Sequence, residues 1–117
     1  MRLLILSLVL AWACPAQSKA QSKELAGNAE NGKRLFQKNG CYQCHGTVGQ
    51  GGLAGARLAQ TKLSQAAFLA YLRNPPPGNM PPFRAKVMAD QEVADVWSYI
   101  KTFPEPPSAK SIPILNQ

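Results

Sequence analysis

The chain has 117 residues with a formal net charge of +7, and 16% of its residues are charged. This length allows one domain. The positive charges are spread along the chain rather than gathered in the dense runs that are typical of nucleic-acid-binding arms. The sequence carries no glycine-rich phosphate loop, catalytic carboxylate pair or serine-nucleophile motif. It therefore does not support an enzyme class that depends on one of these motifs.

The N-terminus predicts an export signal. A short basic start precedes an apolar run from residue 3 to residue 13, which is too short to span a bilayer as a helix but is typical of a secretory signal. We expect residues 1–13 to be a signal peptide, with cleavage as late as residue 20, and the protein to be periplasmic or otherwise exported. Membrane attachment would require lipidation of Cys14 or a retained signal. Export also argues against a nucleic-acid partner.

Residues 14–26 are expected to form a flexible lead-in, and the first helix is predicted from residue 28 to residue 39. Asn28 is the expected N-cap. One face of this helix carries Gly32, Leu35 and Phe36. Because glycine in a helix interior is unfavourable by roughly 1 kcal/mol relative to alanine, Gly32 indicates the close approach of another backbone. Asn39-Gly40 then ends the helix.

The run Cys41-Tyr42-Gln43-Cys44-His45 follows. Two thiols separated by two residues, with a histidine directly after them, are typical of c-type haem attachment. The spacing lets each sulfur add to one vinyl group of a porphyrin and brings the imidazole beneath the iron. His45 is the single histidine of the chain, so the opposite axial position takes methionine, water or nothing. A thioredoxin-like pair lacks its preceding strand and a zinc site lacks a second ligand pair, whereas a plain disulfide stays open.

Two further segments are predicted before the next informative loop. Residues 46–55 are too rich in glycine for regular structure, and such a loop can lie flat against a planar ligand. A middle helix is expected from Ser64, its N-cap, to Arg73, and Pro75 stops it.

The loop from residue 74 to residue 83 carries five prolines around Met80. Proline fixes φ and reduces the entropy lost on ordering, so we expect a stiff loop that presents one thioether. Met80 is therefore the favoured sixth ligand, although the usual role of methionine is to fill a core. Met88 is the second candidate.

The last helix is predicted from residue 90 to residue 102, and it starts at Asp90 or at Ala89 with Glu92. Its apolar residues stand at positions i, i+3, i+4 and i+7, and they are Val93, Val96, Trp97 and Ile100. Residues 105–117 form a proline-rich tail that is extended and either loose or laid on the surface.

In this order, the elements of residues 27–104 resemble a class I c-type cytochrome. The resemblance rests on Gly32, Phe36, the Cys41–His45 run, Arg73-Asn74-Pro75, Met80-Pro81 and Trp97. It implies an all-α fold with three to four helices around one covalently bound haem, in which the first and last helices cross. Gly32 would then lie against the face of the last helix that carries Trp97.

The same resemblance implies four haem-binding side chains, namely the thioether-forming Cys41 and Cys44 and the axial ligands His45 and Met80. Gly55-Ala56 corresponds to a Gly-Pro pair of the family, and the Ala56 carbonyl would accept a hydrogen bond from the proximal imidazole. From their charge, Arg57 and Arg73 are either partners of the haem propionates or ordinary solvated residues.

The expected function is single-electron transfer between redox proteins. The basic charge of the chain could attract a partner whose docking surface is acidic. Methionine opposite histidine raises the reduction potential, and an apolar pocket would come from Leu35, Phe36, Leu58, Phe68, Leu72, Phe83 and Trp97. Two alternatives stay open. One is a haem subunit fixed to a dehydrogenase or oxidase, with the tail as interface. The other is a ligand-binding sensor or peroxidase with an open sixth site, for which a single committed histidine supplies little acid–base chemistry.

Overall fold

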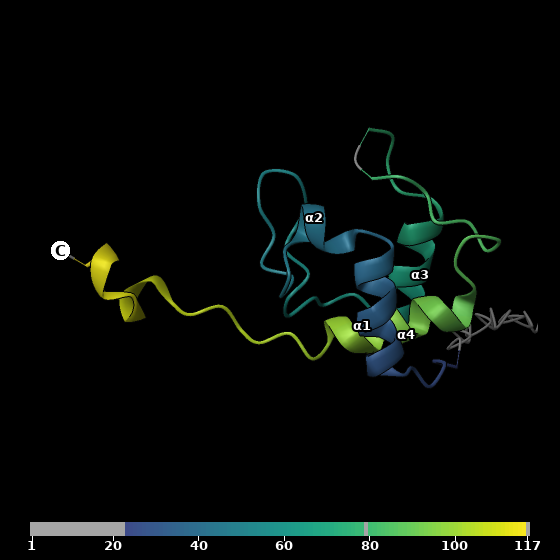
Figure 1. Ribbon diagram of the computed structural model, residues 1–117, viewed down its shortest axis with the longest axis horizontal. Helices are drawn as coiled ribbons and strands as arrows, with labels where there is room; N and C mark the ends of the chain where they lie inside the picture. Colours follow the sequence, from purple (N-terminus) through teal and green to yellow (C-terminus); the bar gives the residue numbers. More distant parts are fainter. Residues whose placement is uncertain (1–22, 79, 117) are drawn as a thin grey trace, which may run out of the picture.

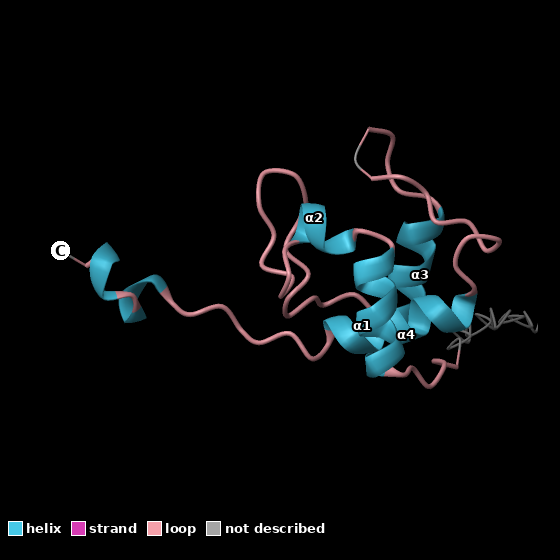
Figure 2. Ribbon diagram, viewed as in Figure 1, coloured by secondary structure: helices cyan, strands magenta, loops and turns pink. Residues whose placement is uncertain are grey.

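The computed structural model describes residues 23–78 and 80–116 (Figures 1 and 2). Within these residues the protein is helical and has no strand, which confirms the all-α prediction. Its elements are α1 (Ala29–Lys38), α2 (Cys41–His45), α3 (Gln65–Arg73), α4 (Asp90–Ile100) and two 3-10 helices, η1 (Ala109–Ser111) and η2 (Pro113–Leu115). None of the described helices has the length and apolar character to span a bilayer. The predicted signal, its cleavage region and Cys14 lie outside the described residues.

Two helices begin at the predicted side-chain caps. Asn28 Oδ1 accepts a hydrogen bond from the Asn31 amide at 3.0 Å at the start of α1. Ser64 Oγ accepts one from the Ala67 amide at 3.2 Å at the start of α3. Gly40, which follows the C-cap residue Asn39 of α1, takes a left-handed φ of 70°. These ends are therefore decided by contacts within one helical turn.

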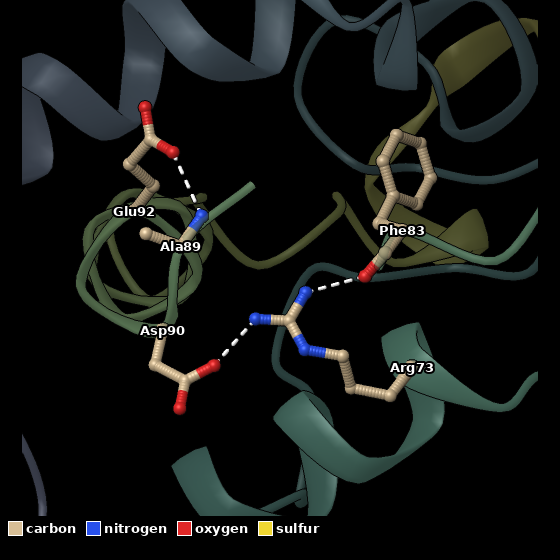
Figure 3. A network of polar contacts seen from close by, with 5 residues as sticks. All are labelled: Arg73, Phe83, Ala89, Asp90 and Glu92. Atoms are coloured by element: carbon tan, nitrogen blue, oxygen red, sulfur yellow. Dashed lines mark hydrogen bonds and ion pairs between the residues drawn. The ribbon is translucent and has the colours of Figure 1, made fainter. Parts of the chain in front are cut away.

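The start of α4 uses the second of the two predicted arrangements. Ala89 is the N-cap residue, and the Glu92 carboxylate accepts a hydrogen bond from the Ala89 amide at 2.8 Å (Figure 3). Asp90 is the first residue of the helix rather than its cap, which leaves its carboxylate available to another partner. The helix ends at Ile100, two residues before the predicted end.

Helices α1 and α4 cross (Figure 1). Gly32 lies where the two helices are in contact. A Cβ at Gly32 would lie 2.5 Å from the carbonyl carbon of Asp95 and 2.9 Å from the Cβ of Tyr99. The close approach is therefore confirmed, but the expectation that it faces Trp97 is wrong. Asp95 and Tyr99 are one turn apart and share a face, whereas Trp97 is rotated about 200° from each of them.

Asp95 is a buried carboxylate, with 5% of its surface exposed. It accepts hydrogen bonds from the Asn28 amide at 2.8 Å, from Asn31 Nδ2 at 2.7 Å and from Gln91 Nε2 at 3.1 Å. Burial has the largest effect on the pKa of Asp95 and raises it, but the three hydrogen bonds together outweigh burial and hold the pKa below its ordinary value. The residue thereby joins the start of α1 to the middle of α4.

The core lies where α1, α3 and α4 meet. Its buried apolar side chains are Leu35, Phe36, Ala59, Phe68, Leu72, Met88, Val93, Val96, Ile100 and Phe103. The rings of Phe36, Tyr99 and Phe103 meet edge to face, with centroids 4.9 to 5.6 Å apart. This arrangement is the one that the charge distribution of aromatic rings favours, so Phe103 extends the core beyond the end of α4.

The two flanks of the helical domain are held differently. The Gln65 side chain pairs with both the N–H and the carbonyl of Leu25, at 2.7 and 2.8 Å, so the segment before α1 is fixed to α3. In contrast, η1 and η2 contact each other and none of α1–α4. The tail runs away from the domain (Figure 1), and Ile114 and Leu115 at its end are 73% and 62% exposed. The two 3-10 turns of the tail were not expected from the sequence.

Candidate functional site

The motif residues form α2, a single helical turn with a glycine at each end. Gly40 and Gly46 have φ values of 70° and 82°, which bring the chain into and out of this turn. Cys41, Cys44 and His45 stand at positions i, i+3 and i+4, which are neighbours on a helix surface. Two sulfurs and one imidazole are thus presented together.

Both thiols of α2 are free, and no disulfide joins them. Cys41 is half-buried and Cys44 is exposed. Burial raises the pKa of the Cys41 thiol; the hydrogen bond from its own backbone opposes this effect, and the neighbouring Cys44 adds to it. The structure gives no support to the disulfide alternative, and both sulfurs keep the thiol that thioether formation needs.

The imidazole of His45 is oriented by the loop that follows the motif. Its Nδ1 lies 2.6 Å from the carbonyl oxygen of Ala56. A protonated Nδ1 can donate to this carbonyl, which leaves Nε2 free to bind a metal. This is the contact that the family resemblance implies for Ala56.

The contact depends on how closely the glycine-rich loop returns to α2. A Cβ at Gly55 would lie only 2.7 Å from the carbonyl oxygen of Cys44, so this position accepts glycine alone. The Gly51 amide donates to the carbonyl of His45 at 2.9 Å. The loop is therefore folded against the motif, and it brings Ala56 to the imidazole.

The two methionines of the described residues lie in different environments. Met88 is 1% exposed and belongs to the core, where methionine usually fills space. Met80 is partly buried, lies on the loop between α3 and α4, and packs on the outside of the core. This loop and α2 project from the same side of the crossed helices in Figure 1.

The two arginines that were candidates for propionate contacts bind protein groups. Arg57 Nε donates to the carbonyl of Ala59 at 3.1 Å. Arg73 donates to the carbonyl of Phe83 and forms an ion pair with Asp90, with Nη2 and Oδ1 2.5 Å apart (Figure 3). Arg73 thereby connects the end of α3 to the Met80 loop and to the start of α4. A propionate contact of either arginine stays a prediction.

The side chains present suit a covalently held haem. Among the described residues, no three His, Cys, Asp or Glu side chains gather into a metal-ligand cluster. Partly buried apolar side chains pack around the core, and they are Cys41, Tyr42, Leu58, Leu69, Met80, Phe83, Trp97 and Tyr99. Within the described chain, Trp97 Nε1 is the one buried side-chain N or O atom without a hydrogen-bond partner. Haem propionates carry the acceptor oxygens that such a donor lacks.

The site contains contacts that sequence reasoning missed. The bonds from Arg73 to Phe83 and Asp90 join residues 10 and 17 positions apart, and no local pattern marks them. The helical form of α2 had one available signal, because the motif spacing is also the spacing of one helix face.

A protein-family model described as cytochrome c oxidase, cbb3-type, subunit III matches residues 27–100. The matched region contains α1 to α4 and covers more than half of the chain. Neither a search of curated proteins nor a search of solved structures finds a significant match. The chain therefore belongs to the cbb3-type cytochrome c oxidase subunit III family, whose c-type cytochrome domain transfers electrons through covalently attached haem c.

Proposed function

We propose that the chain is an exported monohaem electron carrier whose iron is bound axially by His45 and Met80. One observation carries this proposal: a single helical turn presents two free thiols and an imidazole whose Nδ1 lies 2.6 Å from the Ala56 carbonyl. When bound, the haem supplies a one-electron iron couple. Loss of Arg2 with the signal peptide lowers the formal net charge from +7 to +6, and this remaining positive charge suits a redox partner with an acidic docking surface.

Each residue of the site then has its own task. Cys41 and Cys44 hold the cofactor through thioether bonds, so it stays attached in both redox states. Ala56 keeps the imidazole of His45 in one tautomer and orientation, which makes Nε2 the better ligand. Met80 supplies a soft thioether, which favours the reduced iron and raises the reduction potential. The apolar side chains around the core exclude water.

The axial assignment is tested by exchanging each methionine for leucine. Leucine removes the thioether while conserving most of the volume, a swap that usually costs less than about 1.5 kcal/mol of stability in a core. In the haem-loaded ferric protein, Met80→Leu should abolish the weak band at the red end of the visible spectrum that reports methionine–iron ligation. Met88→Leu is the matched control and should keep the band. Loss of the band in Met88→Leu alone would transfer the ligand role to Met88.

An open sixth site is the competing assignment, because it would turn the protein into a ligand-binding sensor or peroxidase. The haem-loaded ferrous protein should then bind carbon monoxide readily without any substitution, and the ferric band should be absent. Ligation by Met80 predicts slow and weak binding of carbon monoxide that becomes fast in Met80→Leu. The same two measurements therefore separate the two assignments.

A second candidate function is that of a haem subunit fixed to an oxidase or dehydrogenase complex. The family description and the protruding tail, with Ile114 and Leu115 exposed, favour it. Gel filtration of a native extract, followed by haem absorbance, should show the chain at high mass if it is a subunit. Deletion of residues 105–117 should then return it to the size of a monomer. A free carrier would elute as a monomer in both cases.

Export is tested on the mature chain. We expect protein recovered from the periplasmic fraction to begin between residues 14 and 21, as mass spectrometry of the intact protein would show. A chain that keeps residue 1 and fractionates with the cytoplasm would contradict export, and a lipid-sized mass added at Cys14 would establish membrane attachment.

A further inference from the structure

The loop that carries Met80 returns to the helical domain at Phe83. The Phe83 amide donates to the carbonyl of Leu72 at 2.8 Å, and the Phe83 carbonyl accepts a hydrogen bond from Arg73. Both backbone polar groups of Phe83 are thus bound by consecutive residues at the end of α3. The loop is closed at its base by this pair of bonds.

Arg73 is itself held in place by α4. Its guanidinium forms the ion pair with Asp90, the first residue of that helix (Figure 3). The Arg73 side chain is 17% exposed and the Asp90 side chain 59% exposed. The planar fork of arginine can serve the carbonyl and the carboxylate at once, which a lysine ammonium does less well. One side chain therefore connects α3, the loop and α4.

Phe83 is joined to Met80 by Pro81 and Pro82. Proline has a fixed φ and no N–H, so this connection is stiff and cannot form amide hydrogen bonds of its own. Among the described residues 75–78 and 80–82, none makes a backbone hydrogen bond. The two hydrogen bonds of Phe83 therefore hold the loop where it returns to the helical domain. Because Pro81 and Pro82 are stiff, the position of Phe83 determines the position of Met80.

We propose that Arg73 is a positioning residue that determines how firmly Met80 is held against the iron. This inference rests on the proposed ligation by Met80. Without the guanidinium, the Phe83 carbonyl loses its partner and the base of the loop is held by a single backbone bond. Met80 then leaves the iron more often, and a competing ligand binds in proportion to the fraction of open site.

The test is an equilibrium titration of the haem-loaded ferric protein with imidazole, followed by the methionine–iron band. Arg73→Gln should tighten imidazole binding about tenfold, which corresponds to ~1.4 kcal/mol. Arg73→Lys should recover part of the change, because it keeps the charge but not the fork. Asp90→Asn should have a smaller effect than Arg73→Gln, because an exposed ion pair is worth little.

Arg84→Gln is the matched control, since it removes the same charge one residue beyond Phe83, and its side chain makes no hydrogen bond within the described residues. It should leave imidazole affinity unchanged. Arg73→Gln with the affinity of Arg84→Gln would overturn the proposal while ligation by Met80 stands. If Met80→Leu keeps the band, ligation itself fails and the role of Arg73 falls with it. Should Arg73→Gln not fold, the comparison of Arg73→Lys with Arg84→Lys decides in the same way.

Discussion

Replacing Gly32 by alanine tests how tightly α1 and α4 meet. In a helix interior, alanine is favoured over glycine by about 1 kcal/mol. Here the added Cβ would lie 2.5 Å from the Asp95 carbonyl carbon and 2.9 Å from the Tyr99 Cβ, well inside van der Waals separation. Overpacking of this kind typically costs ~1–3 kcal/mol, and a helix carbonyl cannot turn aside as a flexible side chain does. We therefore expect the steric cost to exceed the helix-propensity gain, with a net loss of up to about 2 kcal/mol in unfolding free energy.

Guanidinium denaturation of the haem-loaded protein, followed by circular dichroism, measures this loss. Gly52→Ala is the matched control, because a Cβ at Gly52 meets no atom within 4 Å and Gly52 has no positive φ. Its unfolding free energy should stay within about 0.5 kcal/mol of the parent. If Gly32→Ala is instead stabilised by the ~1 kcal/mol that helix propensity alone predicts, then α1 and α4 do not touch at Gly32.

Two further predictions concern the buried carboxylate and the tail. Asp95→Asn should lower the unfolding free energy by about 1–3 kcal/mol at neutral pH, because an amide cannot replace all the accepted hydrogen bonds. The folded pKa of Asp95 is below the unfolded value, so its stabilisation is complete above the ordinary carboxyl pKa of about 4 and is lost as pH falls through the lower folded pKa. Denaturation at a series of pH values should show the two proteins converging in acid, and a constant difference would refute this origin. Deletion of residues 105–117 should change the unfolding free energy by less than about 0.5 kcal/mol, since η1 and η2 contact none of the helices; a larger loss would show that the tail packs on the domain.

The parts of the fold that local sequence predicted well are those decided within one turn. Asn28 and Ser64 cap their helices through amides three residues away, and Gly40 takes the left-handed conformation that ends α1. The apolar spacing of α4 likewise placed Val93 and Ile100 in the core. Short-range hydrogen bonds and helical periodicity carry this information in the sequence itself.

Contacts between distant segments were the ones that sequence could not supply. Asp95 looks like a surface residue by its charge and position, but it is buried because it binds Asn28, 67 residues earlier in the chain. The prediction that Gly32 lies against the Trp97 face of α4 was wrong for a related reason. A glycine in a helix indicates that another backbone comes close, but it does not indicate which face of the other helix makes the contact. For Arg73 the sequence suggested a propionate partner or a solvated side chain, whereas the structure binds it to Phe83 and Asp90.

The crossed helices and the loop that carries Met80 are held by different interactions, so substitutions in one should have little effect on the other. The crossed helices depend on the approach of α1 to α4 at Gly32 and on the bonds of Asp95. The Met80 loop depends on the bonds at Phe83. The contacts at Gly32 and those at Phe83 share no bonding partner, so substitutions at the two sites should act nearly additively. Gly32→Ala should thus lower the unfolding free energy and leave imidazole affinity unchanged, and Arg73→Gln should raise that affinity with a smaller effect on unfolding. If Gly32→Ala also loosened Met80, the crossing of α1 and α4 would have to be counted among the determinants of axial ligation.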